Sequence, residues 1–198
     1  METLSKLFGG AGYVKAMRLF LFNPESAFGA REVSGRSKIS LSEAKRVLTH
    51  LERAAFIKRR LFLKGDGRRG GIGFSLDQSF PYLSELQNLL IDSVLMKNEE
   101  IMRRLGRVGK IKLIISSGVF LREFDDSRVD LLIVGDNIRR SSLENVIKTM
   151  ESEIGKELRY SVLNTDDYKY RASICDKLIR DIFDFPHSVV TDKIGLSG

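Results

Sequence analysis

Residues 40–55 read SLSEAKRVLTHLERAA, and this stretch decides the fold of the N-terminal half. It opens with a capping box: the Ser40 hydroxyl can accept from the N–H of Glu43, and the Glu43 carboxylate can accept from the N–H of Ser40. A helix is therefore predicted over 41–55. Its inward stripe recurs at three- and four-residue steps and consists of Leu41, Ala44, Val47, Leu48, Leu51 and Ala55. The outer side is polar with cations, and it carries Ser42, Lys45, Arg46, Thr49 and Arg53.

Two shorter helices precede this one. Residues 14–22 form an apolar-rich run that Asn23 and Pro24 end, because proline disfavours the helical conformation in the residue before it. Residues 27–35 form a second short segment that ends at Gly35, a residue favoured at helix C-termini. The chain thus reaches residue 40 through two helices.

A basic hairpin follows. Residues 56–64 are typical of a strand, the glycine-rich segment 65–71 of a turn, and alternating apolar residues at 72, 74 and 76 of a second strand. The order of three helices and a hairpin predicts a winged helix-turn-helix domain over 1–78. In that fold the third helix, here 41–55, enters the major groove, while the wing, here 57–76, lies along the phosphate backbone or the minor groove.

The positive charge is confined to the same half. Residues 1–78 hold 15 Lys/Arg and 7 Asp/Glu, a net +8, whereas residues 79–198 hold 18 and 19, a net −1. Between Arg36 and Arg69 there are 11 cations against 3 acids. Because the charge gathers where the topology puts the helix and wing, double-stranded DNA is the expected partner.

The N-terminal half resembles the ArsR-type winged-helix domain of prokaryotic regulators. The resemblance rests on residues 7–10, 14–24, 31–33 and 48–58, and it departs at Ala55, where the family usually has a glycine that ends the recognition helix. It implies that Ser42, Lys45, Arg46 and Thr49 face the bases. Arg46 is the first choice for base reading, with a phosphate contact or a solvated side chain as the alternative. Arg53, on the same outer side, is a further expected DNA contact. Contacts to phosphates or the minor groove are expected from Arg59, Arg60, Lys64, Arg68 and Arg69.

Residues 79–109 are expected to connect the two halves. A single long helix is predicted over 81–105, because leucine, valine and isoleucine recur near helical period from Leu83 to Leu105. This stripe could pair two protomers on two half-sites or pack on its own domains. We expect a homodimer.

Residues 110–198 predict a small α/β domain, so the fold class of the whole chain is α+β. Strands are expected at 111–116, 129–134 and 158–163, and helices at 143–154 and 174–185. The segments 113–118, 127–135, 165–168 and 176–182 resemble the core of a minimal nucleotidyltransferase, and one branch of the ArsR-type family is fused to such a domain.

The resemblance implies a nucleotide-binding site, and departures from the family pattern predict that this site no longer catalyses nucleotidyl transfer. Active members hold Mg²⁺ with two acids two residues apart on one strand, since alternate side chains face the same side. Here Asp130 matches the second acid, but Arg128 takes the place of the first, and Ser116 and Ser117 replace a Gly-Ser pair, with glycine displaced to Gly118. No catalytic residue is therefore expected. The remnant could bind a nucleotide or another anion, contact a protein partner, or be inherited scaffold.

Composition excludes several other classes. No run reaches the roughly 18 apolar residues of a membrane span, and no secretory leader is evident, so a cytoplasmic location is expected. One cysteine, Cys175, and two histidines give neither an intramolecular disulfide nor a metal site, and we expect this cysteine to be buried. No cofactor is expected. The leading hypothesis is a DNA-binding transcriptional regulator, and the alternatives are a nucleotidyltransferase and an antitoxin-like protein that neutralises a partner.

Overall fold

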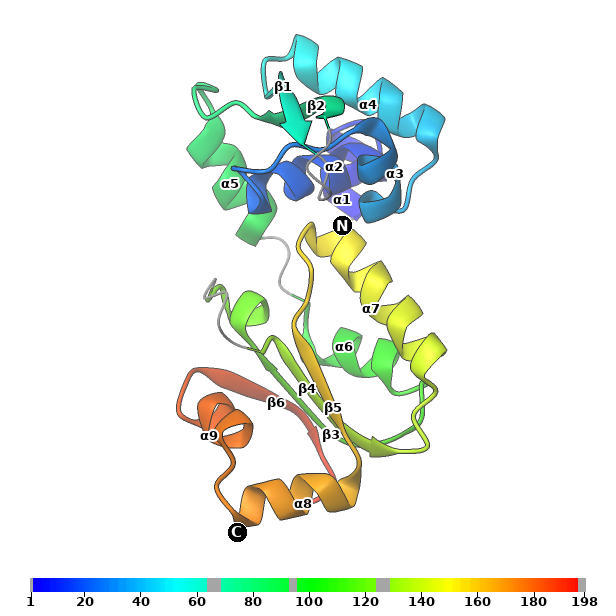
Figure 1. Ribbon diagram of the computed structural model, residues 1–198, viewed down its shortest axis with the longest axis vertical. Helices are drawn as coiled ribbons and strands as arrows, with labels where there is room; N and C mark the ends of the chain where they lie inside the picture. The colour runs from blue at the N-terminus through cyan, green and yellow to red at the C-terminus, as the bar shows by residue number, and fades with distance from the viewer. Residues whose placement is uncertain (1, 64–68, 93–95, 124–128, 196–198) are drawn as a thin grey trace. The chain divides into compact units, whose positions relative to one another are not determined.

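The computed structural model describes residues 2–63, 69–92, 96–123 and 129–195 (Figure 1). Helices and strands are mixed, which confirms the α+β class. The chain forms two compact units: the first contains residues 1–94 together with 148–157, and the second contains residues 95–147 together with 158–198.

The first unit is built on helices that share one apolar core. The helices are α1 (Glu2–Leu7), α2 (Ala11–Phe22), α3 (Ala30–Ser37), α4 (Leu41–Arg53) and α5 (Leu83–Asp92). Helix α2 is central, since Val14, Ala16 and Phe20 are fully buried. It ends at Phe22, as the Asn23-Pro24 pair predicts. Helix α3 starts at residue 30 rather than 27, because the backbone of Phe28 instead pairs with Phe74 in an isolated bridge.

Two antiparallel strands follow α4. They are β1 (Ile57–Leu63) and β2 (Arg69–Leu76), and their register pairs Ile57 with Leu76 at the base of the hairpin. Both of these side chains are buried, whereas Leu61 and Ile72, paired further along, are exposed. The hairpin is therefore anchored in the core at its base and extends into solvent beyond it.

Within the first unit, a buried arginine joins α2 and α5 to the segment 148–157. Arg18 of α2 is 2% exposed, and its guanidinium donates to the carbonyls of Leu90 (3.0 Å) and Glu153 (2.7 Å). Both acceptors lie in the last turn of their helices, where carbonyls lack intrahelical partners and the helix dipole favours a cation. Burial lowers the pKa of Arg18 to about 10, and the nearby Glu153 opposes that shift. At pH 7 the side chain is still charged.

Gly155 allows residues 148–157 to approach α2. Its φ is +94°, and a Cβ at this position would lie 2.6 Å from the carbonyl carbon of Arg18. Only glycine tolerates both the dihedral and the contact. The carbonyl of Gly155 also accepts from the Asn23 side chain at 2.9 Å. The end of the second unit's longest helix thus belongs to the first unit.

The single long helix predicted over 81–105 is wrong. Helix α5 ends at Asp92, and α6 (Asn98–Leu105) begins after Met96 and Lys97, which are not helical. The apolar stripe divides in the same way: Leu90 is buried in the first unit's core, whereas α6 belongs to the second unit and buries Ile101 and Leu105 there. The apolar residues of α5 and those of α6 are buried in different units, so their burial does not require one continuous helix.

The second unit is a four-stranded mixed sheet with helices. Its strands are β3 (Lys110–Ser117), β4 (Leu131–Asp136), β5 (Tyr160–Leu163) and β6 (His187–Asp192), in the order β5-β4-β3-β6. Strand β3 is antiparallel to both neighbours, and β4 is parallel to β5. The remaining elements are the 3-10 turn η1 (Gly118–Leu121) and helices α7 (Arg140–Ile154), α8 (Thr165–Ser173) and α9 (Lys177–Phe183).

The sequence did not predict every element of this unit. Strand β6 and helix α8 were not expected, and the helix predicted over 174–185 is only α9. Cys175 lies between α8 and α9 with a φ of +51° and is exposed, so the expectation of a buried cysteine is wrong. The left-handed backbone at Cys175 lies in the short connection that separates α8 from α9.

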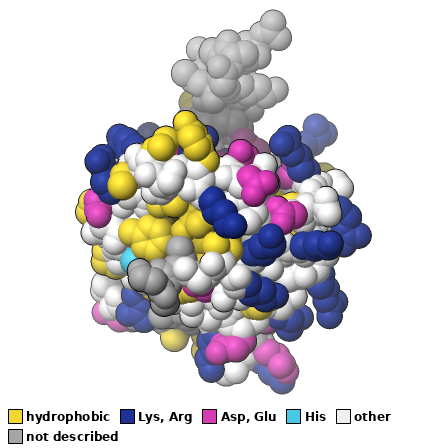
Figure 2. All heavy atoms as spheres, turned by 90° about the horizontal axis from the view of Figure 1, so that it is seen from below, with side chains coloured by type: hydrophobic (Ala, Val, Ile, Leu, Met, Phe, Trp, Pro, Cys, Tyr) yellow, Lys and Arg dark blue, Asp and Glu magenta, His cyan; other side chains and the backbone are white. Residues whose placement is uncertain are grey.

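Helices α8 and α9 share a core with one face of the sheet (Figure 1). This core combines Leu113, Ile115, Leu132 and Val134 of the central strands with Tyr168, Ile179 and Ile182. Hydrophobic side chains also remain at the surface here, among them Tyr170, Ile174 and Phe185. Figure 2 shows a group of hydrophobic side chains beside a histidine, with lysine and arginine side chains next to the group and over the right of the view.

Candidate functional site

The outer face of α4 has the composition predicted for it. The Ser40 hydroxyl accepts from the Glu43 N–H at 3.2 Å and so caps the helix. The inner face buries Ala44, Val47, Leu48 and Leu51. The prediction is wrong for Leu41, which is 38% exposed, and for Ala55, which is exposed and lies beyond the helix end at Arg53. The exposed outer side chains are Ser42, Lys45, Arg46, Thr49 and Arg53. All five predicted outer residues therefore lie on one accessible helix.

The cations on this face differ from its hydroxyls in how they are engaged. Thr49 donates to the Lys45 carbonyl at 3.0 Å, and Ser42 shares a hydrogen bond of 3.0 Å with the Ser40 hydroxyl. Within the described part of the chain, the side chains of Lys45, Arg46 and Arg53 form no hydrogen bond or ion pair. These three side chains can therefore bind an anion without first breaking an ion pair to a described carboxylate.

The cations at the base of the hairpin are engaged within the protein. Arg59 binds Glu52 of α4 through two hydrogen bonds, of 2.6 and 3.3 Å, and these raise the pKa of Arg59. Arg60 donates to the carbonyl of Glu25 at 3.2 Å. Lys58 contacts Asp77 at 3.2 Å; hydrogen bonds from Ser79 and then from Lys58 lower the pKa of that carboxyl.

The predicted cations of the hairpin tip fall largely outside the described residues. Lys64 and Arg68 lie outside them, and for Arg69 only the backbone is described. Lys58 was not among the residues singled out from the sequence, although its strand position gave a signal equal to that of its two arginine neighbours. Among the described side chains, the α4 cations Lys45, Arg46 and Arg53 are therefore unpaired, whereas the β1 cations Lys58, Arg59 and Arg60 have partners.

The second predicted site surrounds the turn that ends β3. Ser116 is 1% exposed and donates to the Ser188 carbonyl at 3.4 Å, while the Ser117 hydroxyl donates to the carbonyl of Val129. Gly118 follows with a φ of +53°, and a Cβ there would lie 2.3 Å from an oxygen of Asp130. The turn thus requires glycine because of both its dihedral and the adjacent carboxylate.

Asp130 holds this turn together. It is 7% exposed; one carboxylate oxygen accepts from the N–H of Val119 at 2.9 Å, and the other accepts from the N–H of Arg159 at 2.9 Å. The two oxygens of Asp130 therefore bind the backbone of the segment after β3 and of the segment before β5. Arg128, at the position of the missing first acid, lies outside the described residues.

The described residues bring Ser117 and Gly118 together with α9 and with two acids, Glu123 and Asp181. They line a cavity of about 310 Å³ that also includes Lys177 and Asp181. Within the described ranges, no three His, Cys, Asp or Glu side chains come close enough to hold a metal ion. Strand β5 carries no acidic residue.

The chain matches no family model, no curated protein and no solved structure. Among the helices of the described residues, none is long and apolar enough to span a bilayer. The functional assignment rests on the chain's own residues.

Proposed function

We propose that the protein is a sequence-specific transcriptional regulator that binds double-stranded DNA through a winged helix-turn-helix. The observation that carries this proposal is the outer face of α4, where Lys45, Arg46 and Arg53 are exposed and unpaired within the described residues. A phosphate or base acceptor gains the full interaction with such a cation, because no existing ion pair must be broken.

The arrangement of α3 and α4 supports this proposal. Three residues, 38–40, separate the helices, and Lys38 has a left-handed φ of +50°. Helix-turn-helix motifs use a turn of about three to four residues that often contains glycine, the residue that most readily adopts this conformation. The 13 residues of α4 span about 20 Å, and a helix fits the major groove, which is about 12 Å wide.

Within this proposal, the side chains on α4 divide into base readers and phosphate contacts. Arg46 and Lys45 would donate to the O6 and N7 acceptors of guanine, whereas Ser42 and Thr49 accept or donate with less selectivity. Arg53 lies at the C-terminal end of the helix and would contact phosphate. The tip of the hairpin, with Lys64, Arg68 and Arg69, would contact the backbone or minor groove and add affinity without much sequence information.

The second unit would serve dimerisation, partner docking or ligand sensing. Its exposed Tyr170, Ile174 and Phe185 support docking of a protein, including a second copy of the chain. The use of both Asp130 oxygens by backbone N–H groups supports the loss of nucleotidyl transfer, since a carboxylate so engaged is poorly placed to bind Mg²⁺. No observation favours the enzyme or the antitoxin alternative over the regulator.

Fluorescence anisotropy with the full chain tests the proposal. A duplex from the region upstream of the protein's own coding sequence is compared with a scrambled duplex at several salt concentrations. We expect salt-dependent binding that prefers the native duplex, and Arg46→Ala should narrow that preference by about 1–3 kcal/mol.

Lys169→Ala is the matched control. Lys169 is an exposed cation of α8, and it has no ion pair within the described residues. We expect this variant to bind both duplexes as the parent does. Binding that ignores both salt and sequence would refute the proposed function, and equal losses on both duplexes for Arg46→Ala would refute base reading by that residue.

A further inference from the structure

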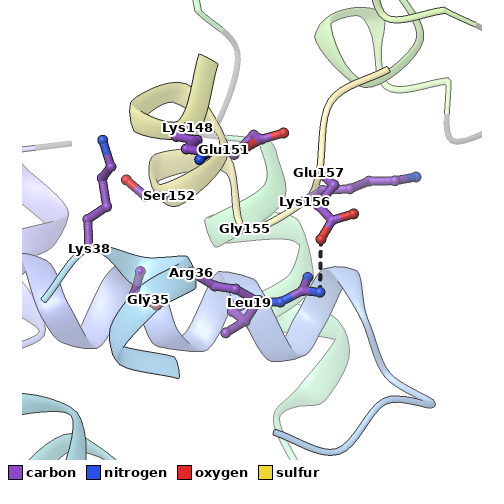
Figure 3. Close-up of a pocket in the computed structure, with 11 residues that line it drawn as sticks. Leu19, Gly35, Arg36, Lys38, Lys148, Glu151, Ser152, Gly155, Lys156 and Glu157 are labelled. Atoms are coloured by element: carbon purple, nitrogen blue, oxygen red, sulfur yellow. Dashed lines mark ion pairs between the residues drawn. The ribbon is translucent and has the colours of Figure 1, made fainter. Parts of the chain in front are cut away.

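A cavity of about 270 Å³ lies in the first unit, beside the C-terminal turn of α3 (Figure 3). Residues of α2 and α3 line it together with residues from the segment 148–157, and all of them belong to the first unit. In Figure 3, Lys38 and Ser152 lie on one side and the Arg36–Glu157 ion pair on the other. The cavity is therefore formed by segments far apart in the sequence.

The lining carries an excess of positive charge. Four cations, Arg36, Lys38, Lys148 and Lys156, face two acids, Glu151 and Glu157, which leaves a net +2. Arg36 is paired with Glu157 at 2.8 Å, and Lys38 donates to the Thr149 hydroxyl at 2.8 Å. Lys148 forms no hydrogen bond or ion pair with any described residue. A molecule in this cavity would thus experience a positive electrostatic potential and could contact the Lys148 ammonium group, which has no partner among the described residues.

A second observation points to a polar occupant. Ser37, which also lines the cavity, is 1% exposed, and its hydroxyl lacks a hydrogen-bond partner within the described residues. No other buried side-chain polar atom of the described residues shares this property. Buried polar groups are almost always satisfied, so an orphan beside a cavity indicates a partner that comes from outside the chain.

We propose that this cavity is a binding site for a small organic anion that carries carboxylate or phosphate groups. Its volume is near the lower end of the range of small-molecule sites, roughly 300–1,000 Å³, which suits a molecule no larger than a mononucleotide. The cations bind the charged groups, and an acceptor on the anion satisfies the Ser37 hydroxyl. Leu19 and the methylene stems of the lysines cover the apolar part.

Isothermal titration calorimetry of the full chain with pyrophosphate and with citrate tests the proposal. We expect at least one probe to bind at about millimolar concentration or tighter, and Lys148→Ala to weaken it about tenfold, as for loss of one charge-assisted hydrogen bond. Gly35→Met should also weaken binding. Gly35 lines the cavity and a Cβ there meets no heavy atom within 4 Å, so a longer side chain can be placed at the cavity wall without displacing the core.

Two controls separate this site from the proposed DNA surface. Arg46→Ala, on α4, and Lys169→Ala, on α8, should leave the affinity for both probes within about twofold of the parent. The proposal would be overturned if neither probe binds. It would also be overturned if Arg46→Ala weakens probe binding and Lys148→Ala does not. Because calorimetry uses no DNA, its outcome is independent of whether the protein binds DNA. Preference for pyrophosphate or for citrate distinguishes phosphate from carboxylate recognition.

Discussion

Replacing Ala55 with glycine should stabilise the first unit. Helix α4 ends in a Schellman motif, in which the N–H of Phe56 donates to Leu51 at 3.0 Å and that of Ala55 donates to Glu52 at 2.9 Å. The motif places Ala55 at a φ of +59°. Glycine adopts this left-handed conformation without steric cost, whereas a Cβ costs about 1–2 kcal/mol.

The net gain is smaller than this conformational cost. Glycine loses about 0.4–1 kcal/mol more conformational free energy on folding than alanine does. Ala55 is exposed, so its methyl group contributes no core packing to offset the change. We therefore expect Ala55→Gly to raise the free energy of unfolding by about 0.5–1 kcal/mol, which for a unit of this size corresponds to a rise in Tm of roughly 2–6 °C.

Urea unfolding followed by circular dichroism at 222 nm measures this change. The matched control is Ala54→Gly, one residue earlier, where φ is −76° and glycine has no advantage. We expect the control to lower the free energy of unfolding by about 0.5–1 kcal/mol. A destabilised Ala55→Gly variant, or equal effects at both positions, would show that the left-handed backbone at Ala55 does not cost about 1–2 kcal/mol.

Four further predictions concern the core, the second unit and the wing. Arg18→Met removes two hydrogen bonds from a buried cation and should cost about 3 kcal/mol or more in urea unfolding, whereas Arg31→Met, an exposed control on α3, should change stability by less than about 0.5 kcal/mol. Asp130→Asn should destabilise the second unit by about 1–3 kcal/mol with or without Mg²⁺, and a loss seen only with Mg²⁺ would instead indicate a metal ligand. Hydrogen bonds from Lys112 and then from Thr165 lower the pKa of Asp136 from 3.8 to about 2. Its stabilisation is thus fully present above about pH 4 and lost as pH falls towards 2, so the difference in urea midpoint between the parent and Asp136→Asn should vanish near pH 2. Arg68→Ala combined with Arg69→Ala should weaken binding to native and scrambled duplexes alike and reduce the salt slope by up to about 2, and an unchanged slope would argue against phosphate contacts by the wing.

Local patterns determined much of the first unit. The cap at Ser40, the helical period of the stripe through Leu51 and the stop at Asn23-Pro24 all act over one or two turns, so their energetics are visible in the sequence. The same holds for the basic outer face of α4. A helix that must bury one side necessarily exposes the residues between, and their identity is written in the chain.

Packing decided what the stripe from Leu83 to Leu105 does. A helical period states which residues need burial but not which core receives them. Leu90 is buried in one unit and Ile101 in the other, and the helix breaks between them. Strand β6 was not predicted for a related reason: it lies at an edge of the sheet and its residues are mostly only partly buried.

Tertiary structure also decided which charges are available. Along the sequence Arg46 and Arg59 look equivalent, yet folding brings Glu52 to Arg59 and leaves Arg46 without a carboxylate among the described residues. Asp130 matches a metal-binding acid in sequence but, once folded, binds two backbone N–H groups. The cavity beside α3 is lined by Arg36 and Lys148, which are 112 positions apart in the sequence. Sequence determined which residues carry charge, and only the fold, through contacts distant along the chain, decided which of those charges are neutralised.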